Sequence, residues 1–187
     1  MAIFFKQVFI FFVLILFVLI YPRHTNGIER LSRGSAQLQP GSLTKENDIR
    51  VKILRDYLNQ YFSPLSANAK DFVEYADAFN LDWRLVASIS GVESTFGKFI
   101  PNNSYNAWGW GVYGNNVILF SSWREGIETV SRGLRENYLN KIGSDNIYRI
   151  GRWYAASPRW AANVEFFMNK IAEFQSDKAT YNLSISL

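Results

Sequence analysis

An uninterrupted apolar run near the start of the sequence sets the first limit on how this chain can fold. Residues 8–21, VFIFFVLILFVLIY, carry no polar side-chain group except the hydroxyl of Tyr21. A helix packed at the edge of a soluble core needs a polar face, and this run has none. We therefore expect residues 1–21 to be a membrane or signal helix, and the folded domain to begin after it.

Length and flanking residues bear on whether this helix is retained. Fourteen apolar residues are typical of a signal peptide, whereas residues 3–21 could span a bilayer if Lys6 extends to the interface. The next residues, 22–25 (PRHT), lack a small-x-small cleavage pattern. We favour an uncleaved membrane anchor through residues 3–21, with a cleaved signal peptide as the alternative.

Composition excludes several kinds of active site. The chain has 187 residues, no cysteine and one histidine, His24. Thiol nucleophiles, disulfides and metal sites with two histidines are therefore excluded, and we expect no metal and no cofactor. His24 lies in residues 22–43, a Gly-, Pro- and Ser-containing stretch that we interpret as a flexible linker, so a His-dependent triad is not expected. A net charge of +4 without a basic run gives no reason to expect nucleic acid as a partner.

Apolar periodicity predicts one helical domain over residues 44–176. We expect its helices, in order, from Thr44 to before Pro64, from Ser66 to about Phe79, from 83 to about 94, from Ser122 to about Tyr138, near 145–155, and over 158–175. Asp82 is the expected cap of the third helix. Residues 177–187 are expected to form a loose C-terminal tail.

Residues 97–121, GKFIPNNSYNAWGWGVYGNNVILFS, interrupt the helical pattern. Their five Asn and four Gly are too many for a helix. Residues 117–120 form a short β-type run, and a turn at Gly114-Asn115 or Asn115-Asn116 would complete a small hairpin. The expected fold is mainly α, with a small β-hairpin lobe.

Glu93 is predicted on the apolar face of the third helix. At 100° per residue it falls between Val86 and Ile89. A carboxylate on a buried face loses hydration, so its pKa should rise. A carboxylic acid that stays protonated near neutral pH can protonate a glycosidic oxygen. The alternative is a partly exposed Glu at the helix end, paired with Lys98.

Aromatic and amide side chains follow Glu93 closely. Gly97 allows the chain to turn directly after the acid, and the loop then carries Trp108 and Trp110. These two indoles point the same way if the chain is extended. Flat aromatic faces stack on sugar rings, and Asn amides can bond hydroxyl and N-acetyl groups. The loop is therefore a candidate sugar-binding cleft, with core packing as the alternative for each aromatic residue.

Three short motifs in this order resemble the glucosaminidase family. They are ESTFGK at 93–98, NAWGW at 106–110 and YAASPRW at 154–160. That family includes bacterial autolysins and domains similar to mannosyl-glycoprotein endo-β-N-acetylglucosaminidase, and it belongs to the lysozyme-like superfamily. The resemblance covers about residues 65–175 and implies a lysozyme-like helical domain. A similar layout, with the same Glu-Ser pair, occurs in soluble lytic transglycosylases and goose-type lysozymes.

The resemblance implies roles for particular residues. Glu93 would be the general acid. Tyr154 would face it from a later helix, as a second catalytic residue in contact with the N-acetyl sugar or the oxocarbenium-like centre, with a core aromatic as the alternative. The implied substrate-binding residues are Ser94, Phe96, Asn106, Trp108, Gly109 and Trp110. Of these, Ser94 would cap or orient nearby groups.

A second catalytic carboxylate is not evident. Region 97–121 contains none, although retaining and inverting glycosidases both use a pair, and the chain has Ser157 where the family pattern often has an acid. Glu125 and Glu128 are weak candidates, because acids at the start of a helix are favoured by its dipole. In the other route the N-acetyl oxygen of the sugar attacks, and one acid suffices. We favour this substrate-assisted route.

The expected function is cleavage of β-1,4 bonds next to N-acetylglucosamine in peptidoglycan strands, by a monomer. A muramidase, a lytic transglycosylase and a non-catalytic glycan-binding module are alternatives. The domain would then lie in the cell envelope outside the cytoplasm, membrane-anchored or secreted. Arg23, Arg30 and Arg33 follow the apolar run and, taken alone, predict the opposite orientation. We give this charge bias less weight, because it is small and large domains translocate largely regardless of charge.

Overall fold

The computed structural model describes residues 48–111, 118–143 and 145–184. These residues belong to one compact unit, which spans Leu38–Leu187. The predicted anchor at 1–21, the linker at 22–43 and the turn at 114–116 lie outside the described residues. Within the described ranges, no helix combines the length and apolar character needed to cross a membrane.

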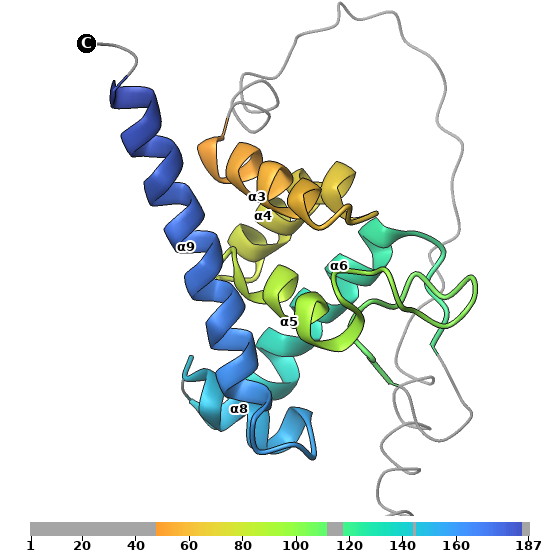
Figure 1. Ribbon diagram of the computed structural model, residues 1–187. Coiled ribbons are helices and arrows are strands. Elements are labelled where there is room, and N and C mark those ends of the chain that lie inside the picture. Colours follow the sequence, from red (N-terminus) through yellow and green to blue (C-terminus); the bar gives the residue numbers. More distant parts are fainter. Residues whose placement is uncertain (1–47, 112–117, 144, 185–187) are drawn as a thin grey trace, which may run out of the picture. The chain divides into compact units, whose positions relative to one another are not determined.

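The described residues are mainly helical, as predicted (Figure 1). In chain order the elements are α3 (Ile49–Gln60), η1 (Ser66–Asn68), α4 (Ala69–Ala78), α5 (Leu85–Ser94), α6 (Trp123–Gly133), η2 (Leu134–Leu139), α7 (Asn140–Ile142), α8 (Ile147–Tyr154) and α9 (Trp160–Ser184). The η2 segment is a π-helical turn that continues α6 into α7.

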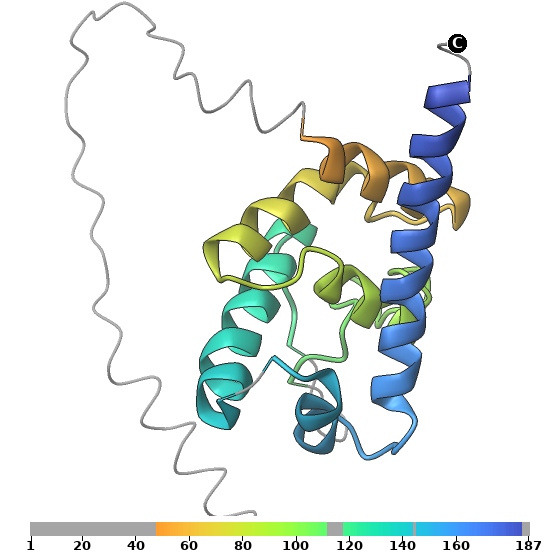
Figure 2. The same cartoon turned by 90° about the vertical axis from the view of Figure 1, so that its left-hand side faces the viewer.

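Helix α5 lies at the centre of the packing. It contacts α4, α6 and α9, and Figure 2 shows the long α9 running past it. All residues from Leu85 to Gly91 are buried. Because these first two turns have no side facing solvent, they carry no charged residue. Gly91 permits the close packing, because a Cβ there would lie 2.7 Å from the ring of Phe96. Glu93 is the only charged residue of α5.

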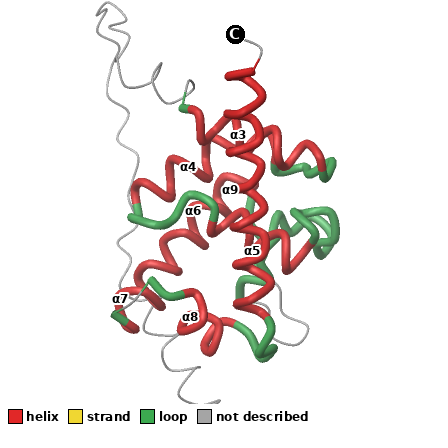
Figure 3. Tube along the Cα trace, turned by 60° about the vertical axis from the view of Figure 1, so that its left-hand side comes forward, coloured by secondary structure: helices red, strands yellow, loops and turns green. Residues whose placement is uncertain are grey.

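The predicted β-hairpin is not seen, and the described residues contain no strand (Figure 3). Residues 118–120 instead join the preceding loop through their backbone. The carbonyl of Ile118 accepts a hydrogen bond from Asn106 Nδ2 at 3.1 Å. The amide of Phe120 donates to the carbonyl of Ser104 at 2.8 Å. These bonds satisfy backbone groups that a strand would direct to a partner strand.

Helix starts agree in part with the predicted caps. Ser122 is the N-cap of α6, as predicted, and its Oγ accepts a hydrogen bond from Glu125 N at 3.2 Å. The cap of α3 is Asp48 instead of Thr44, which lies outside the described residues. Asp82 accepts from Arg84 N at 2.9 Å, but α5 begins only at Leu85, two residues later than expected.

The predicted tail at 177–187 is wrong as far as residue 184. Helix α9 continues to Ser184, because no Gly or Pro interrupts it after Trp160. Its middle packs on α5 and its earlier turns pack on α8. Helix α9 therefore starts at Trp160, the last residue of the YAASPRW motif, and continues to Ser184.

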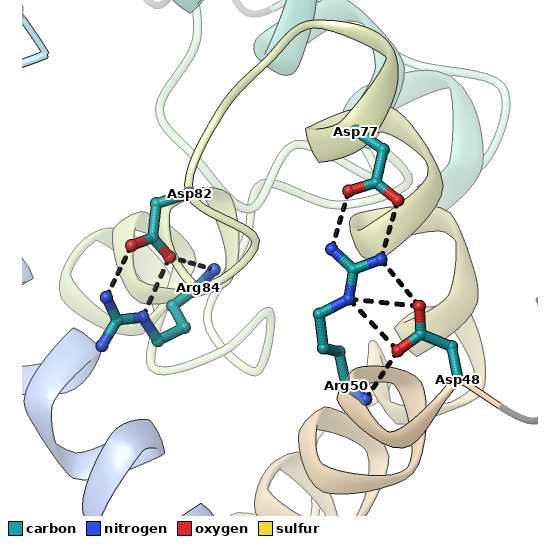
Figure 4. Close-up of polar contacts among 5 residues, drawn as sticks. All are labelled: Asp48, Arg50, Asp77, Asp82 and Arg84. Carbon is teal, nitrogen blue, oxygen red and sulfur yellow. Dashed lines mark hydrogen bonds and ion pairs between the residues drawn. The ribbon is translucent and has the colours of Figure 1, made fainter.

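A charged cluster joins the start of α3 to the end of α4 (Figure 4). Arg50 donates to both oxygens of Asp77, at 2.7 and 2.8 Å, and to the N-cap residue Asp48 at 2.7 Å. Nearby in the same view, Arg84 forms an ion pair with Asp82 before α5. We call Asp48, Arg50 and Asp77 the N-terminal brace.

Candidate active site

Glu93 lies one residue before the end of α5. Its Oε1 accepts a hydrogen bond from Nε1 of Trp160 at 2.6 Å. Its Oε2 lies 3.5 Å from the point that a Cβ on Gly109 would occupy. Trp160 is buried, whereas Glu93 is exposed. The prediction of a Glu93 on a buried face is therefore wrong, and the exposed helix-end position that we gave as the alternative is the one found. Since α5 ends at Ser94, the side chain leaves the core at its edge.

The surroundings raise the pKa of Glu93, which is the predicted direction. Partial removal of water from the carboxyl group is the main cause, and the smaller effect of the Trp160 hydrogen bond lowers the pKa. The carboxylate of Glu93 is held by the Trp160 indole, and no Glu93–Lys98 ion pair forms among the described residues. Glu93 thus combines access to solvent with an increased tendency to hold a proton.

A tight turn follows Glu93 and is fastened by Ser94. Thr95, Phe96 and Gly97 all have positive φ, at 52°, 58° and 80°. The buried Ser94 Oγ accepts a hydrogen bond from Gly97 N at 2.9 Å and lies 2.7 Å from the carbonyl of Ala107, to which it can donate. Ser94 therefore joins the turn to the Asn/Gly loop and can orient both. Because it is buried, its expected contact with substrate has no support in this arrangement.

Asn106 organises that loop from inside the protein. Its Nδ2 donates to the carbonyls of Trp110 and Ile118, at 2.8 and 3.1 Å. Its Oδ1 accepts from the amides of Trp110 and Trp108, at 3.0 and 3.4 Å. These four bonds use the full capacity of a carboxamide, and the residue is buried. Asn106 is therefore placed as a positioning residue, not on the cleft surface where we expected it.

The two indoles of the loop do not form the predicted exposed pair. Trp108 is fully buried and donates from Nε1 to the carbonyl of Val86 at 2.9 Å. Trp110 is half-buried and packs against Tyr138 and Tyr154. The chain between the indoles turns at Gly109, with φ of +59°, and so is not extended. Gly109 itself is exposed beside Glu93, which agrees with its expected place.

Phe96 also lies away from any accessible surface. Its ring is fully buried and contacts Tyr57, Tyr61 and Phe167 at centroid distances of 5.9, 4.5 and 5.0 Å. Phe96 anchors the turn after Glu93 in the core. The expected contact between Phe96 and a sugar has no support in this arrangement.

Tyr154 and Trp160 close the other side of the site. Their rings are stacked, with centroids 4.5 Å apart and planes inclined by 23°. The Tyr154 hydroxyl donates to the carbonyl of Trp108 at 2.9 Å. Burial raises the pKa of Tyr154 well above its usual value, and the charge of Glu93 adds to this, so the hydroxyl stays protonated. The structure thus brings Tyr154 close to Glu93, as expected.

Trp160 is the site residue that sequence reasoning missed. It lies 67 residues after Glu93 and supplies the hydrogen bond to its carboxylate. The available signal was its place as the last aromatic residue of the YAASPRW stretch, which we quoted for the resemblance without assigning it a role.

Both weak candidates for a second carboxylate are held elsewhere. Glu125 Oε2 accepts from the amide and hydroxyl of Ser121, at 2.6 and 2.5 Å, and these bonds lower its pKa. Glu128 accepts from the Tyr75 hydroxyl at 3.0 Å and pairs with Arg132. Their contacts are those of residues that stabilise the start of α6 and its packing against α4.

Comparison with models of known protein families and with curated proteins finds no match for the sequence. Function must therefore be argued from the site. What converges there is a solvent-accessible carboxyl group, a neutral indole donor, a stacked tyrosine and an exposed glycine backbone. This arrangement can orient one carboxylic acid toward a ligand at the surface.

Proposed function

We propose that this chain is a peptidoglycan hydrolase that cleaves β-1,4 bonds next to N-acetylglucosamine, with Glu93 as general acid. One observation carries the proposal. The Glu93 carboxyl is exposed, has a raised pKa and is held by the neutral N–H of Trp160. A glycosidase acid needs these properties, since it must reach the leaving oxygen while protonated.

In the proposed reaction Glu93 transfers its proton to the glycosidic oxygen as the bond from that oxygen to C1 breaks. The N-acetyl carbonyl oxygen of the same sugar forms a bond to C1 and gives a cyclic oxazolinium ion. Water then attacks C1, returns a proton to the Glu93 carboxylate and reopens the ring. This route needs one protein acid, and it is favoured because Glu125 and Glu128 are engaged elsewhere.

Digestion of purified peptidoglycan by the full chain tests the proposal. Glu93→Gln should reduce product release by at least about 100-fold while binding is retained. Glu125→Gln, the same chemical change at an exposed helix start, is the matched control and should digest normally. Full activity of Glu93→Gln would refute the assignment. Binding without digestion by the wild type would favour a glycan-binding module.

Product chemistry separates the remaining mechanisms. Mass spectrometry of the new ends should find reducing N-acetylglucosamine, whereas anhydro-muramyl ends would identify a lytic transglycosylase. Strands whose N-acetyl groups have been removed should not be cleaved. Efficient cleavage of such strands would refute substrate assistance and leave the general acid in place.

The proposed substrate implies a location in the cell envelope. We propose that residues 3–21 anchor the chain in the membrane, with the catalytic domain outside the cytoplasm, and that it acts as a monomer on glycan strands. Membrane fractionation after mild protease treatment of intact spheroplasts tests this topology. Protection of the domain in intact spheroplasts would contradict it.

A further inference from the structure

Three cationic side chains and an indole surround a small cavity between α7 and α8. The cavity has a volume of about 250 Å³ and is lined by Lys141, Arg149, Arg152 and Trp153. All four residues are exposed, and Trp153 is 75% accessible to solvent. We call these four residues the cationic groove. An indole this open has little role in holding the core.

The charges of the cationic groove have no acidic partner among the described residues. A larger cavity of about 420 Å³ offers a contrast, because each of its charged side chains has a hydrogen-bond or ion-pair partner. There Arg84 pairs with Asp82, and Arg135 bonds the carbonyl of Phe79 at 2.7 Å. The charged residues of the larger cavity therefore already have partners. The cationic groove presents three positive charges to solvent and so favours an anion.

The groove residues indicate the kind of anion. Arginine guanidinium groups bind carboxylates in a two-pronged geometry, and an exposed indole face packs on a sugar ring. An anion that is part of a glycan satisfies both requirements. A free inorganic ion would leave Trp153 without a contact.

The groove lies on the same helix as one residue of the candidate active site. Three of its residues belong to α8, whose last residue, Tyr154, stacks on Trp160, and Trp160 donates a hydrogen bond to Glu93. We infer that a glycan strand bound at Glu93 extends over the end of α8, and that the cationic groove binds free carboxylates carried by the peptide substituents of that strand. The identity of that strand rests on the proposed function.

Co-sedimentation with peptidoglycan freed of phosphate polymers tests the inference. The full chain carrying Glu93→Gln serves as the parent, so that the wall is not digested. Adding Arg149→Gln and Arg152→Gln should weaken binding at low salt by about tenfold or more. Adding Lys52→Gln and Lys170→Gln removes the same charge from exposed or half-exposed sites on α3 and α9 and is the matched control. Circular dichroism checks that each variant is folded.

Chemical blocking of the wall identifies the anion. Converting its free carboxylates to neutral amides should weaken binding of the parent to the level of the groove variant. Equal binding of the groove and control variants, or undiminished binding to the amidated wall, would overturn the inference. The inference would also be overturned if the groove substitutions weakened binding only to a wall that retains its phosphate polymers. Phosphate would then be the anion that the groove binds.

The two proposals fail in different ways. Groove-dependent binding together with no digestion by the wild type would refute the proposed function and leave the groove as a glycan site. If a chain with intact Glu93 digests the wall normally and the groove variants bind like the control, only the inference about the cationic groove is refuted. Trp153→Ala, which changes no charge, should weaken binding independently of salt.

Discussion

Carboxylates in two regions of this domain have partners of different charge. In the N-terminal brace, Asp48 and Asp77 are held by the guanidinium of Arg50 (Figure 4). At the candidate active site, Glu93 is held by the indole of Trp160. The hydrogen bond from Arg50 is the main cause that lowers the pKa of Asp48, whereas loss of hydration raises the pKa of Glu93.

A carboxylate that stabilises the fold and a carboxylic acid that donates a proton need different partners. A cationic partner keeps a carboxylate ionised, which suits a brace and prevents proton donation. At Glu93 a neutral donor orients the carboxyl group. Its hydrogen bond lowers the pKa of Glu93, but by less than the loss of hydration raises it. The site as a whole follows the second pattern, because Ser94 and Asn106 position its loops by uncharged hydrogen bonds.

The largest stability effect is expected at Asn106. Asn106→Ala would leave the carbonyls of Trp110 and Ile118 and the amide of Trp110 without their partner. We expect a loss of about 2–3 kcal/mol in the free energy of unfolding. Urea unfolding should give the same loss at low and high salt, because no charge is involved.

The control for this change is Asn163→Ala, at an exposed position on α9. It should alter the free energy of unfolding by less than about 0.5 kcal/mol. If the two substitutions had equal effects, the neutral hydrogen bonds of Asn106 would not be what holds the loop.

Trp160→Phe should have the next largest effect, on activity. The ring that stacks on Tyr154 is kept, but the donor to Glu93 is lost. Because that hydrogen bond lowers the pKa of Glu93, its removal should raise this pKa further and move the alkaline limb of kcat/KM to higher pH. We also expect kcat to fall about tenfold through poorer orientation, a loss of ~1.4 kcal/mol.

Trp123→Phe is the matched control, since Trp123 is half-buried and packs on Tyr105 away from Glu93. Its pH profile should equal that of the wild type. An unchanged alkaline limb in Trp160→Phe would mean that the indole does not tune the proposed acid.

The helical architecture and the central acid were predictable because both depend on local sequence. Apolar spacing indicated the α5 and α6 regions, and Ser122, just before the apolar pattern of the second of these, indicated the cap of α6. The direction of the pKa shift of Glu93 also followed from its place beside apolar residues. Its exposure was given only as the alternative, because apolar spacing placed Glu93 on the buried face although the helix was expected to end at about residue 94.

Other features of the site depend on contacts across the fold. The burial of Trp108 follows from the turn at Gly109 and the nearby carbonyl of Val86, neither of which is visible in a motif. The bonds of Asn106 reach Ile118, 12 residues further along the same loop. Aromatic residues near an acid can fill a core or bind a sugar, and here Phe96 and Trp108 fill the core.

Asp48→Ala should reduce stability by about 1 kcal/mol at neutral pH, since it removes an N-cap and one partner of Arg50. The pKa of Asp48 is lowered in the folded chain. Its contribution is therefore present above the unfolded pKa of about 3.9 and is lost as pH falls through the folded pKa. Unfolding free energies of wild type and variant should converge in acid and at high salt. An equal difference under all conditions would show that charge does not hold the brace.

The smallest expected effects are on stability. The Glu→Gln substitution should have opposite signs of effect on the unfolding stability at Glu93 and at Glu125. The lowered pKa of Glu125 means that its ionised form stabilises α6, so Glu125→Gln should cost about 0.3–0.5 kcal/mol at neutral pH. The raised pKa of Glu93 means that the folded chain binds its proton more tightly, so stability falls as pH rises from the unfolded to the folded pKa. Glu93→Gln removes that fall and should leave the protein at least as stable as the wild type at neutral pH. Thermal unfolding of both variants measures this difference. A Glu93→Gln variant less stable than Glu125→Gln would mean that Glu93 supports the fold, and the contrast between brace and site would fail.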